Sequence, residues 1–286
     1  MEFTSAEGER KYDALVRAAG RAVVGLDFDG TLSPIVDDPT KAHIHPDAGE
    51  VLVDLAGVVA AVAVVTGRPA RQALDLGGLE EVGNAMADAG KELFLFGQYG
   101  NERWSSTRRR IVSPRPPQGL ATFLRDLPRA LRRADAADAW VEDKGLAHAV
   151  HTRRLPDPEG AFERLLPVLR DLAGRNGLVL EPGRNVIEVR APGMDKGKAV
   201  DALVAEVGAG AFLFAGDDLG DLEAFDAVTA LGKDGLPTLL VCSASEEDAV
   251  SALVERADVV VPGPEGVLDL LRRLAADARA ASRAGS

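Results

Sequence analysis

Short apolar runs and amphipathic segments alternate through both ends of this sequence. The runs AVVGLDF, Ala22–Phe28, and TLLVCSA, Thr238–Ala244, are apolar at nearly every position, and the segments between such runs repeat apolar residues at helical spacing. Strands that are apolar throughout are typical of parallel sheets with helices on both faces. The pattern predicts strands at 22–28, 59–67, 92–100, 211–218, 238–244 and 258–263, and helices at 46–57, 71–79, 195–208, 222–228, 246–257 and 265–278. We therefore expect an α/β fold built on a doubly wound parallel sheet.

The alternation breaks between about Thr107 and Arg190. There a helix, two strands, a second helix and two more strands follow one another, with the turn residues DKG and EPGR between the paired strands. Strand pairs joined by such turns are typical of antiparallel hairpins. We predict a small α+β domain of residues 107–190, inserted into a core of residues 1–106 and 191–286.

Composition narrows the class of protein. A chain of 286 residues buries a large core without disulfides, and its single cysteine, Cys242, lies in an apolar run, which favours a buried structural thiol over a nucleophile. The formal net charge of -12 argues against a nucleic-acid partner, and a solvated loop or edge strand explains the basic triplet Arg108–Arg110 more simply than an anion site. No apolar stretch reaches the roughly 18 residues of a membrane span, and the N-terminal residues are charged. We expect a soluble, cytoplasmic monomer without a membrane partner.

Two aspartates, Asp27 and Asp29, stand one residue apart at the end of the first apolar run. An Asp-Gly pair flanked by hydrophobic residues is a hairpin signal, and aspartate at a strand end also serves turns. A calcium-binding EF-hand loop is excluded, because its glycine stands at position six and Gly30 would stand at position four. The carboxyl ends of parallel strands are also where open α/β sheets bind ligands. The stretch alone leaves both the turn and the ligand site open.

Thr66 and two lysines mark further element ends. Thr66 closes the run VAVVT and either donates a hydrogen bond to a phosphate oxygen or caps the next helix. Lys196 and Lys198 open a predicted helix, where the helix dipole disfavours cations, so either a nearby anion or plain solvation explains them. The segment is not a phosphate-binding P-loop, because only three residues separate Gly193 from Gly197 and alanine follows Lys198.

A second acidic segment, FLFAGDDLGDLEAF, changes the interpretation of the first. It places Asp217, Asp218 and Asp221 after another apolar run, which exceeds the number of acids that helix capping needs. If this strand is a neighbour of the strands that end at Asp27 and Thr66, one crevice holds all of these acids. Two like charges about 4 Å apart cost roughly 4 kcal/mol at an effective dielectric of about 20. Such a cluster predicts a cation, and ligands that are all oxygen favour Mg²⁺.

Taken in order, DFDGT, TGR, the lysine of DKGK and GDDLGD resemble the four motifs of the haloacid dehalogenase superfamily of phosphotransferases. This resemblance implies a Rossmann-like core, Mg²⁺ and an aspartyl-phosphate intermediate. Asp27 would be the nucleophile, and Asp29 the acid that protonates the leaving group and then activates water. Thr66 and Lys196 would bind the phosphoryl group, and the inserted domain would close over the site as a cap. The implied metal ligands are Asp27, Asp29 through its backbone carbonyl, Asp217 and Asp218.

Within that superfamily the chain resembles the trehalose-6-phosphate phosphatase family. The resemblance rests on DFDGTLSPIVDDP, VVTGRP, YGNE, VEDKGLAHAVHTR, PGRNVIEVRAPGMDKGKAV and GDDLGDLEAF. It implies that charged side chains of the cap recognise a sugar, because buried charged hydrogen bonds discriminate strongly. The expected substrate-binding residues are Thr66, Arg68, Asn101, Glu142, Lys144, Arg184 and Glu188. For the cap residues, the alternative is a cross-strand salt pair on a solvated sheet face.

Two places depart from the family pattern. Members often carry Thr-Asp-Glu where Gly220, Asp221 and Leu222 stand, and Ser-His-Gly near residues 99–102, which leaves open which of residues 100–102 meets the sugar. The resemblance implies a phosphatase whose small-molecule substrate is a sugar phosphate, trehalose 6-phosphate. Another sugar phosphate, such as sucrose 6-phosphate or mannosyl-3-phosphoglycerate, and a catalytically silent domain of the same fold are the alternatives.

Overall fold

The computed structural model describes residues 2–36, 38–183, 185–244 and 251–284. The chain divides into two compact units: residues 1–112 with 195–286, called the core unit, and residues 113–194, called the inserted unit. Both ends of the inserted unit lie a few residues beyond the predicted limits of 107 and 190. Within the described ranges, no helix is long and apolar enough to cross a membrane.

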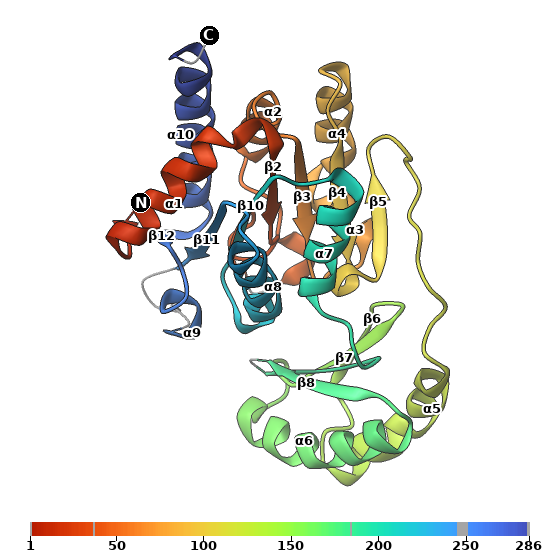
Figure 1. Cartoon of the computed structure of the whole chain (residues 1–286). Coiled ribbons are helices and arrows are strands. Elements are labelled where there is room, and N and C mark those ends of the chain that lie inside the picture. The colour runs from red at the N-terminus through yellow and green to blue at the C-terminus, as the bar shows by residue number, and fades with distance from the viewer. Residues whose placement is uncertain (1, 37, 184, 245–250, 285–286) are drawn as a thin grey trace. The chain divides into compact units, whose positions relative to one another are not determined.

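The core unit is built on an eight-stranded sheet in the order β1-β12-β11-β10-β2-β3-β4-β5 (Figure 1). Neighbouring strands from β12 to β4 run parallel, which confirms the predicted sheet, and β1 and β5 add antiparallel edges. These edge strands lie outside the predicted set, since both are short and lack a continuous apolar run. The strands are β1 (Glu2–Phe3), β2 (Ala22–Leu26), β3 (Ala61–Val65), β4 (Leu93–Gly97), β5 (Glu102–Ser105), β10 (Ala211–Gly216), β11 (Thr238–Ser243) and β12 (Val259–Val261).

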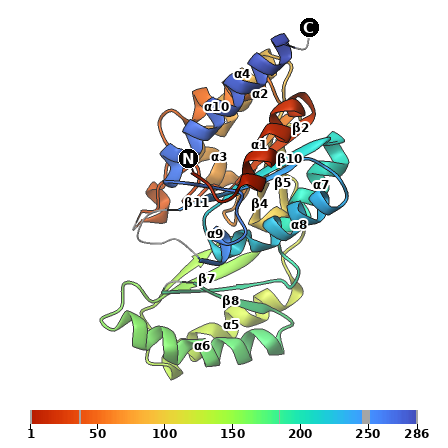
Figure 2. The same cartoon turned by 60° about the vertical axis from the view of Figure 1, so that its left-hand side comes forward.

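Helices cover both faces of this sheet, and Figure 2 shows α2 and α10 on one side with α7 and α8 on the other. Successive residues of β2 supply both layers: Val24 and Leu26 belong to the first hydrophobic cluster, and Val23 belongs to the second. A strand buried on both faces must be apolar throughout, which is why β2 reads as a continuous run. The helices of the core unit are α1 (Ala6–Arg17), α2 (Ala48–Ala56), α3 (Ala70–Gly77), α4 (Leu79–Asp88), α7 (Lys196–Val207), α8 (Leu222–Lys233), α9 (Ser251–Val254) and α10 (Gly263–Ala284), with 3₁₀ turns η1 (Ala19–Arg21), η2 (Pro39–Lys41), η3 (Gln98–Gly100) and η4 (Leu219–Asp221).

Two predicted helices of the core unit differ from the structure. The helix predicted at 71–79 ends at Gly78, whose φ of 54° is left-handed, and a separate helix α4 follows. Glycine adopts this conformation without strain, so the Gly-Gly pair divides the two helices. The helix predicted at 246–257 lies partly outside the described residues, and its described part is α9.

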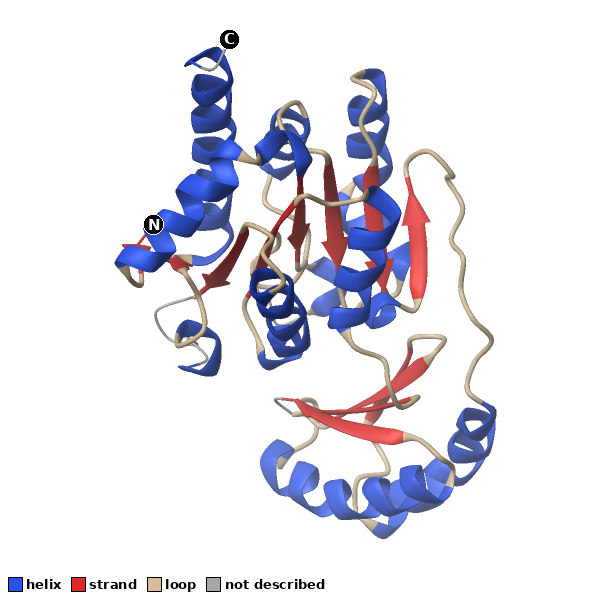
Figure 3. Cartoon of the chain, viewed as in Figure 1, coloured by secondary structure: helices blue, strands red, loops and turns tan. Residues whose placement is uncertain are grey.

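The inserted unit is an antiparallel sheet with two helices on one face (Figure 3). Its strands stand in the order β6-β7-β9-β8. Phe123 of α5 and Leu165 of α6 pack with Val150 and Ile187 of the sheet, which leaves the other face to polar residues. The elements are α5 (Gln118–Arg133), β6 (Trp140–Asp143), β7 (Ala147–His151), α6 (Pro158–Arg175), β8 (Val179–Gly183) and β9 (Val186–Arg190), which confirms the predicted helix, hairpin, helix, hairpin order.

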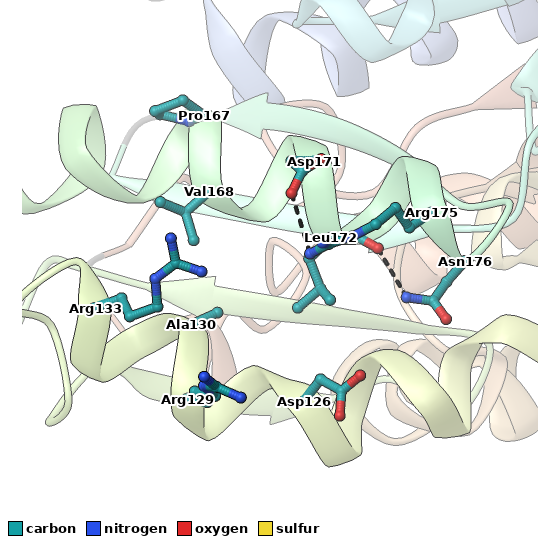
Figure 4. A pocket seen from close by; sticks show the side chains of 10 residues that line it. All are labelled: Asp126, Arg129, Ala130, Arg133, Pro167, Val168, Asp171, Leu172, Arg175 and Asn176. Carbon is teal, nitrogen blue, oxygen red and sulfur yellow. Dashed lines mark hydrogen bonds and ion pairs between the residues drawn. The ribbon is translucent and has the colours of Figure 1, made fainter.

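A surface groove of about 710 Å³ runs between α5 and α6 (Figure 4). Its polar side chains largely serve the helices themselves: Arg175 pairs with Asp171 at 3.1 Å, and the Asn176 amide donates to the Leu172 carbonyl at 2.8 Å. None of the predicted site residues that the structure describes lines this groove.

Candidate active site

Three adjacent parallel strands end at the predicted catalytic residues. β2 lies between β10 and β3, and these strands lead directly into Asp27, Asp217 and Thr66. The Asp27 amide donates to the carbonyl of Ala215 at 2.9 Å, which continues the ladder between β2 and β10 up to the predicted nucleophile. The predicted neighbourhood of these strands is therefore confirmed, and their carboxyl ends form one edge.

A group of three aspartates and one lysine occupies this edge, and all of its members except the half-buried Asp217 are buried. Asp27, Asp217 and Asp221 each offer a carboxylate oxygen, and these oxygens lie within 4.8 Å of one another. The Lys196 ammonium donates to Asp27 at 2.6 Å and to Asp221 at 2.7 Å, and its side chain is only 4% exposed. Among the described residues, one ammonium thus contacts two of the three carboxylates, and it is buried together with both of them.

The electrostatics of the group follow from this imbalance. Burial, and after it the charge of Asp27, raises the pKa of Asp217 to about 10. Burial also raises the pKa of Asp27 well above its usual value, although Lys196 opposes the shift. For Lys196 itself, burial lowers the pKa, but Asp221 and Asp27 outweigh burial and raise it well above its usual value. The raised pKa values of Asp27 and Asp217 show that Lys196 alone does not stabilise their charged forms, and a hard divalent cation fits this set of oxygen donors.

Local sequence explains how two acidic loops come so close. Gly30 has a φ of 71°, and a Cβ atom there would lie 1.9 Å from a carboxylate oxygen of Asp217. Only glycine permits this approach. From β11, which lies on the far side of β10 from β2, the Ser243 hydroxyl donates to the Gly30 carbonyl at 2.6 Å, so the loop that carries Asp27 and Asp29 is fixed to the sheet.

The structure places Asp221, and not the predicted ligand Asp218, beside Asp27 and Asp217. Asp218 is the N-cap of η4 and accepts from the Gly220 amide at 2.8 Å, and it lies outside the group of three. Asp221 is fully buried, accepts from the amides of Asp217 and Asp218 at 3.0 and 3.3 Å, and completes the group. The sequence placed Asp221 among the acids of this crevice but not among the metal ligands, and its position in a capping box with Asp218 is what brings its carboxylate to the group.

Arg68 holds the predicted proton-transfer residue. Its Nε and Nη2 donate to the two carboxylate oxygens of Asp29 at 2.6 and 2.5 Å, and its Nη1 donates to the carbonyl of Pro39 at 2.8 Å. The guanidinium also lies 5.4 Å from the ring centre of Phe28. We predict Arg68 as a substrate ligand, yet in this structure three of its nitrogens are bound by the protein, which orients Asp29.

Two more predicted substrate residues of the core unit lie next to this pair. Thr66 is 1% exposed and its hydroxyl oxygen accepts from the Arg68 amide at 3.1 Å, so it stabilises the turn after β3. The Asn101 amide group donates to the carbonyl of Gln98 at 2.8 Å and closes the turn after β4.

The predicted sugar contacts of the inserted unit gather on the sheet face that α5 and α6 leave open. Glu142 and Glu188 stand opposite Ala149 in register, and the small alanine between them lets long side chains reach across β7. Lys144 donates to Glu188 at 2.6 Å, and His151 lies 2.9 Å from Glu142. Arg184 lies outside the described residues.

Comparisons with known proteins agree with these observations. A family model of trehalose-phosphatase matches residues 25–100 and 129–260. A Mycobacterium tuberculosis protein described as an uncharacterized glycosyl hydrolase is 38% identical over 223 residues, which make up 74% of this chain and 16% of that protein. The trehalose-phosphate phosphatase of Mycobacterium leprae is 28% identical over 267 residues, 90% of this chain and 58% of that protein. The chain thus spans only part of the length of these two relatives.

A solved structure shares the fold across nearly the whole chain. The C-terminal domain of Candida albicans trehalose-6-phosphate phosphatase superposes with a TM-score of 0.72 at 20% identity, covering 96% of this chain and 98% of that one. The family model covers well over half of the chain and includes all of the acidic residues described above. The chain therefore belongs to the trehalose-phosphatase family.

Proposed function

We propose that this chain is a Mg²⁺-dependent phosphatase that hydrolyses trehalose 6-phosphate to trehalose and phosphate. The observation that carries the proposal is the buried group of Asp27, Asp217 and Asp221 around a single lysine, in a chain of this family. Uncompensated buried carboxylates destabilise a protein unless a ligand uses them. A silent domain would gain nothing from keeping them.

The proposed reaction has two steps at Asp27. In the first, a carboxylate oxygen of Asp27 forms a bond to phosphorus while the ester P–O bond breaks, and Asp29 gives its proton to the departing sugar oxygen. In the second, Asp29 takes a proton from water, the water oxygen bonds to phosphorus, and the bond between phosphorus and Asp27 breaks. Phosphate leaves, and both aspartates return to their starting states.

The other residues neutralise and orient the phosphoryl group. Lys196 and the Thr66 hydroxyl bind its oxygens, and Arg68 keeps the Asp29 carboxyl in one orientation. Mg²⁺, when held by Asp27, Asp217 and the Asp29 carbonyl, supplies positive charge at the transferring oxygens. Asp218, also a predicted ligand, fixes the loop that presents Asp217.

The inserted unit supplies the sugar contacts in this proposal. Glu188 is 6% exposed, and the carboxylate oxygen that Lys144 does not bind has no hydrogen-bond partner among the described residues. A buried acceptor of this kind costs free energy, and a sugar hydroxyl would satisfy it. Glu142 and Lys144 lie on the same face, and Asn101 and Arg184 complete the proposed set.

The test is phosphate release from trehalose 6-phosphate, with and without EDTA, by the wild type and by Asp27→Asn. We expect EDTA and the substitution each to abolish turnover. Asp75→Asn, an exposed aspartate of α3, is the matched control and should keep wild-type activity. Turnover that survives both treatments rejects the mechanism. Faster turnover of sucrose 6-phosphate or mannosyl-3-phosphoglycerate rejects the sugar, and no turnover of any phosphate ester would favour a silent domain.

A further inference from the structure

The turn after β4 has a strained backbone beside the predicted phosphoryl-binding residues. Gln98, Tyr99 and Gly100 have φ values of 50°, 56° and 90° in succession. For glycine this conformation is ordinary, but for glutamine and tyrosine it costs conformational energy, and such strain persists where the surroundings impose it, often at functional sites. The turn must therefore be held by strong local contacts.

Backbone hydrogen bonds fasten this turn to the turn after β3. The Tyr99 amide donates to the Thr66 carbonyl at 2.9 Å, and the Gln98 amide donates to the Arg68 carbonyl at 2.8 Å. Gln98 and Tyr99 are thus hydrogen-bonded to the two residues that flank Gly67. In this conformation the Tyr99 side chain lies beside the turn after β3.

The Tyr99 phenol lies against Gly67. A Cβ atom built on Gly67 would come within 2.7 Å of the ring carbon that carries the hydroxyl and within 2.8 Å of the hydroxyl oxygen. Any larger residue at position 67 would displace the phenol. The hydroxyl therefore sits at the residue directly after Thr66, where the phosphoryl group is proposed to bind.

Two other side chains of this turn have structural tasks. Asn101 closes the turn through the Gln98 carbonyl, and Glu102 accepts from the Ala70 amide at 2.6 Å at the start of α3. Gly100 packs against Ala199, one turn after Lys196 on α7. The turn therefore connects the two predicted phosphoryl-binding elements, and Tyr99 is the residue that carries a hydroxyl towards them.

We propose that Tyr99 is a further substrate-binding residue, whose hydroxyl donates a hydrogen bond to a phosphoryl oxygen of the ester bound at Thr66 and Gly67. This inference rests on the proposed function, which it deepens. It differs from the sequence-based prediction, which places the substrate contact of this turn at Asn101. A phenol is a neutral donor, so it adds a directed hydrogen bond to the anion without adding a charge to the buried group.

The test is Tyr99→Phe, which removes only the hydroxyl and keeps the ring on Gly67. We expect the dissociation constant for inorganic phosphate, measured by calorimetry with Mg²⁺ present, to rise by about tenfold, as for the loss of one hydrogen bond to a charged oxygen. The KM values for trehalose 6-phosphate and for p-nitrophenyl phosphate should rise by the same factor with little change in kcat. The melting temperature should stay at the wild-type value.

Tyr12→Phe is the matched control, because Tyr12 is the other of the two tyrosines and its hydroxyl donates to Asp277 at 2.8 Å on the helical layer. That variant should melt at a lower temperature and bind phosphate like the wild type. Unchanged phosphate binding by Tyr99→Phe, or a KM increase confined to trehalose 6-phosphate, would overturn the proposal. Phosphate binding needs no turnover, so the failure of the proposed substrate would leave this result interpretable.

Discussion

The acidic edge of the core unit, where Asp27, Asp217 and Asp221 lie, and the open sheet face of the inserted unit differ in how their charged side chains are paired. At the edge, three carboxylates share the single ammonium of Lys196. On the sheet face, Lys144 meets Glu188 and His151 meets Glu142, so each acid has a neighbouring base. A cluster with more carboxylates than cations is stabilised by binding a cation, whereas acid–base pairs are compatible both with a binding site and with an ordinary sheet surface.

Lys196→Met should have the largest effect, because it removes the ammonium that donates to Asp27 and Asp221. Without Mg²⁺, we expect the free energy of unfolding to fall by about 3–5 kcal/mol, the cost of leaving buried charges without their partner. Phosphatase activity should be lost, since the phosphoryl oxygens lose a cation. Urea unfolding followed by circular dichroism measures the first effect, and added Mg²⁺ should recover part of the stability.

Lys198→Met provides the comparison within the same helical turn. Lys198 lies on the surface, with its side chain 64% exposed, and pairs with Asp195 at 3.5 Å. Such a pair is worth at most about 1 kcal/mol, so this variant should unfold and react nearly like the wild type. Equal stability of the two variants would show that Asp27 and Asp221 do not depend on Lys196.

The position of the acidic edge could be predicted from the sequence because the acids directly follow buried strands there. Each acid follows an apolar run that must be a buried strand, so the position of Asp27 and Asp217 along the sheet follows from strand burial alone. The tasks of Asp218 and Asp221 could not be assigned in the same way, since they depend on which acid caps η4. That choice is decided by backbone geometry within one turn.

The interactions of Arg68 could not be predicted from the sequence either. Its place after β3 follows from the pattern, but its partner Asp29 is 39 residues away, and the bidentate contact appears only in the structure. The pairs of the inserted unit likewise join separate strands, and the register that aligns Glu142 with Glu188 is not encoded by any short motif. Contacts between distant segments were therefore the part that sequence could not supply.

Arg68→Ala should have the next largest effect and tests whether Arg68 positions Asp29. We expect kcat for trehalose 6-phosphate to fall by about 10²-fold, the order expected for a misplaced catalytic group. The fall should be much smaller for p-nitrophenyl phosphate, because nitrophenolate leaves without receiving a proton. Steady-state kinetics with both esters give the ratio, and Arg68→Lys should recover part of the loss.

Arg71→Ala is the control for this experiment. Arg71 lies one turn further along the chain, 64% exposed, and pairs with Glu80 at 3.2 Å on the surface. It should leave both activities unchanged. An equal fall for both esters in Arg68→Ala, together with a raised KM, would instead support the original assignment of Arg68 to substrate binding.

Glu188→Gln tests the paired acids on the sheet face of the inserted unit and should have the smallest effect. If Glu188 binds a sugar hydroxyl, kcat/KM for trehalose 6-phosphate should fall by about tenfold, as for one hydrogen bond to a charged group, while p-nitrophenyl phosphate reacts as before. If Glu188 serves only its pair with Lys144, the melting temperature falls and the ratio of the kcat/KM values for the two substrates stays constant.

Glu181→Gln is the matched control, since Glu181 stands opposite Glu188 in register but is 56% exposed and pairs with Arg190. A change in the ratio of the two activities in Glu188→Gln, but not in Glu181→Gln, would show that Glu188 binds the substrate although it is paired with Lys144. Lys144 binds only one of its carboxylate oxygens, and the other is the proposed acceptor for a sugar hydroxyl.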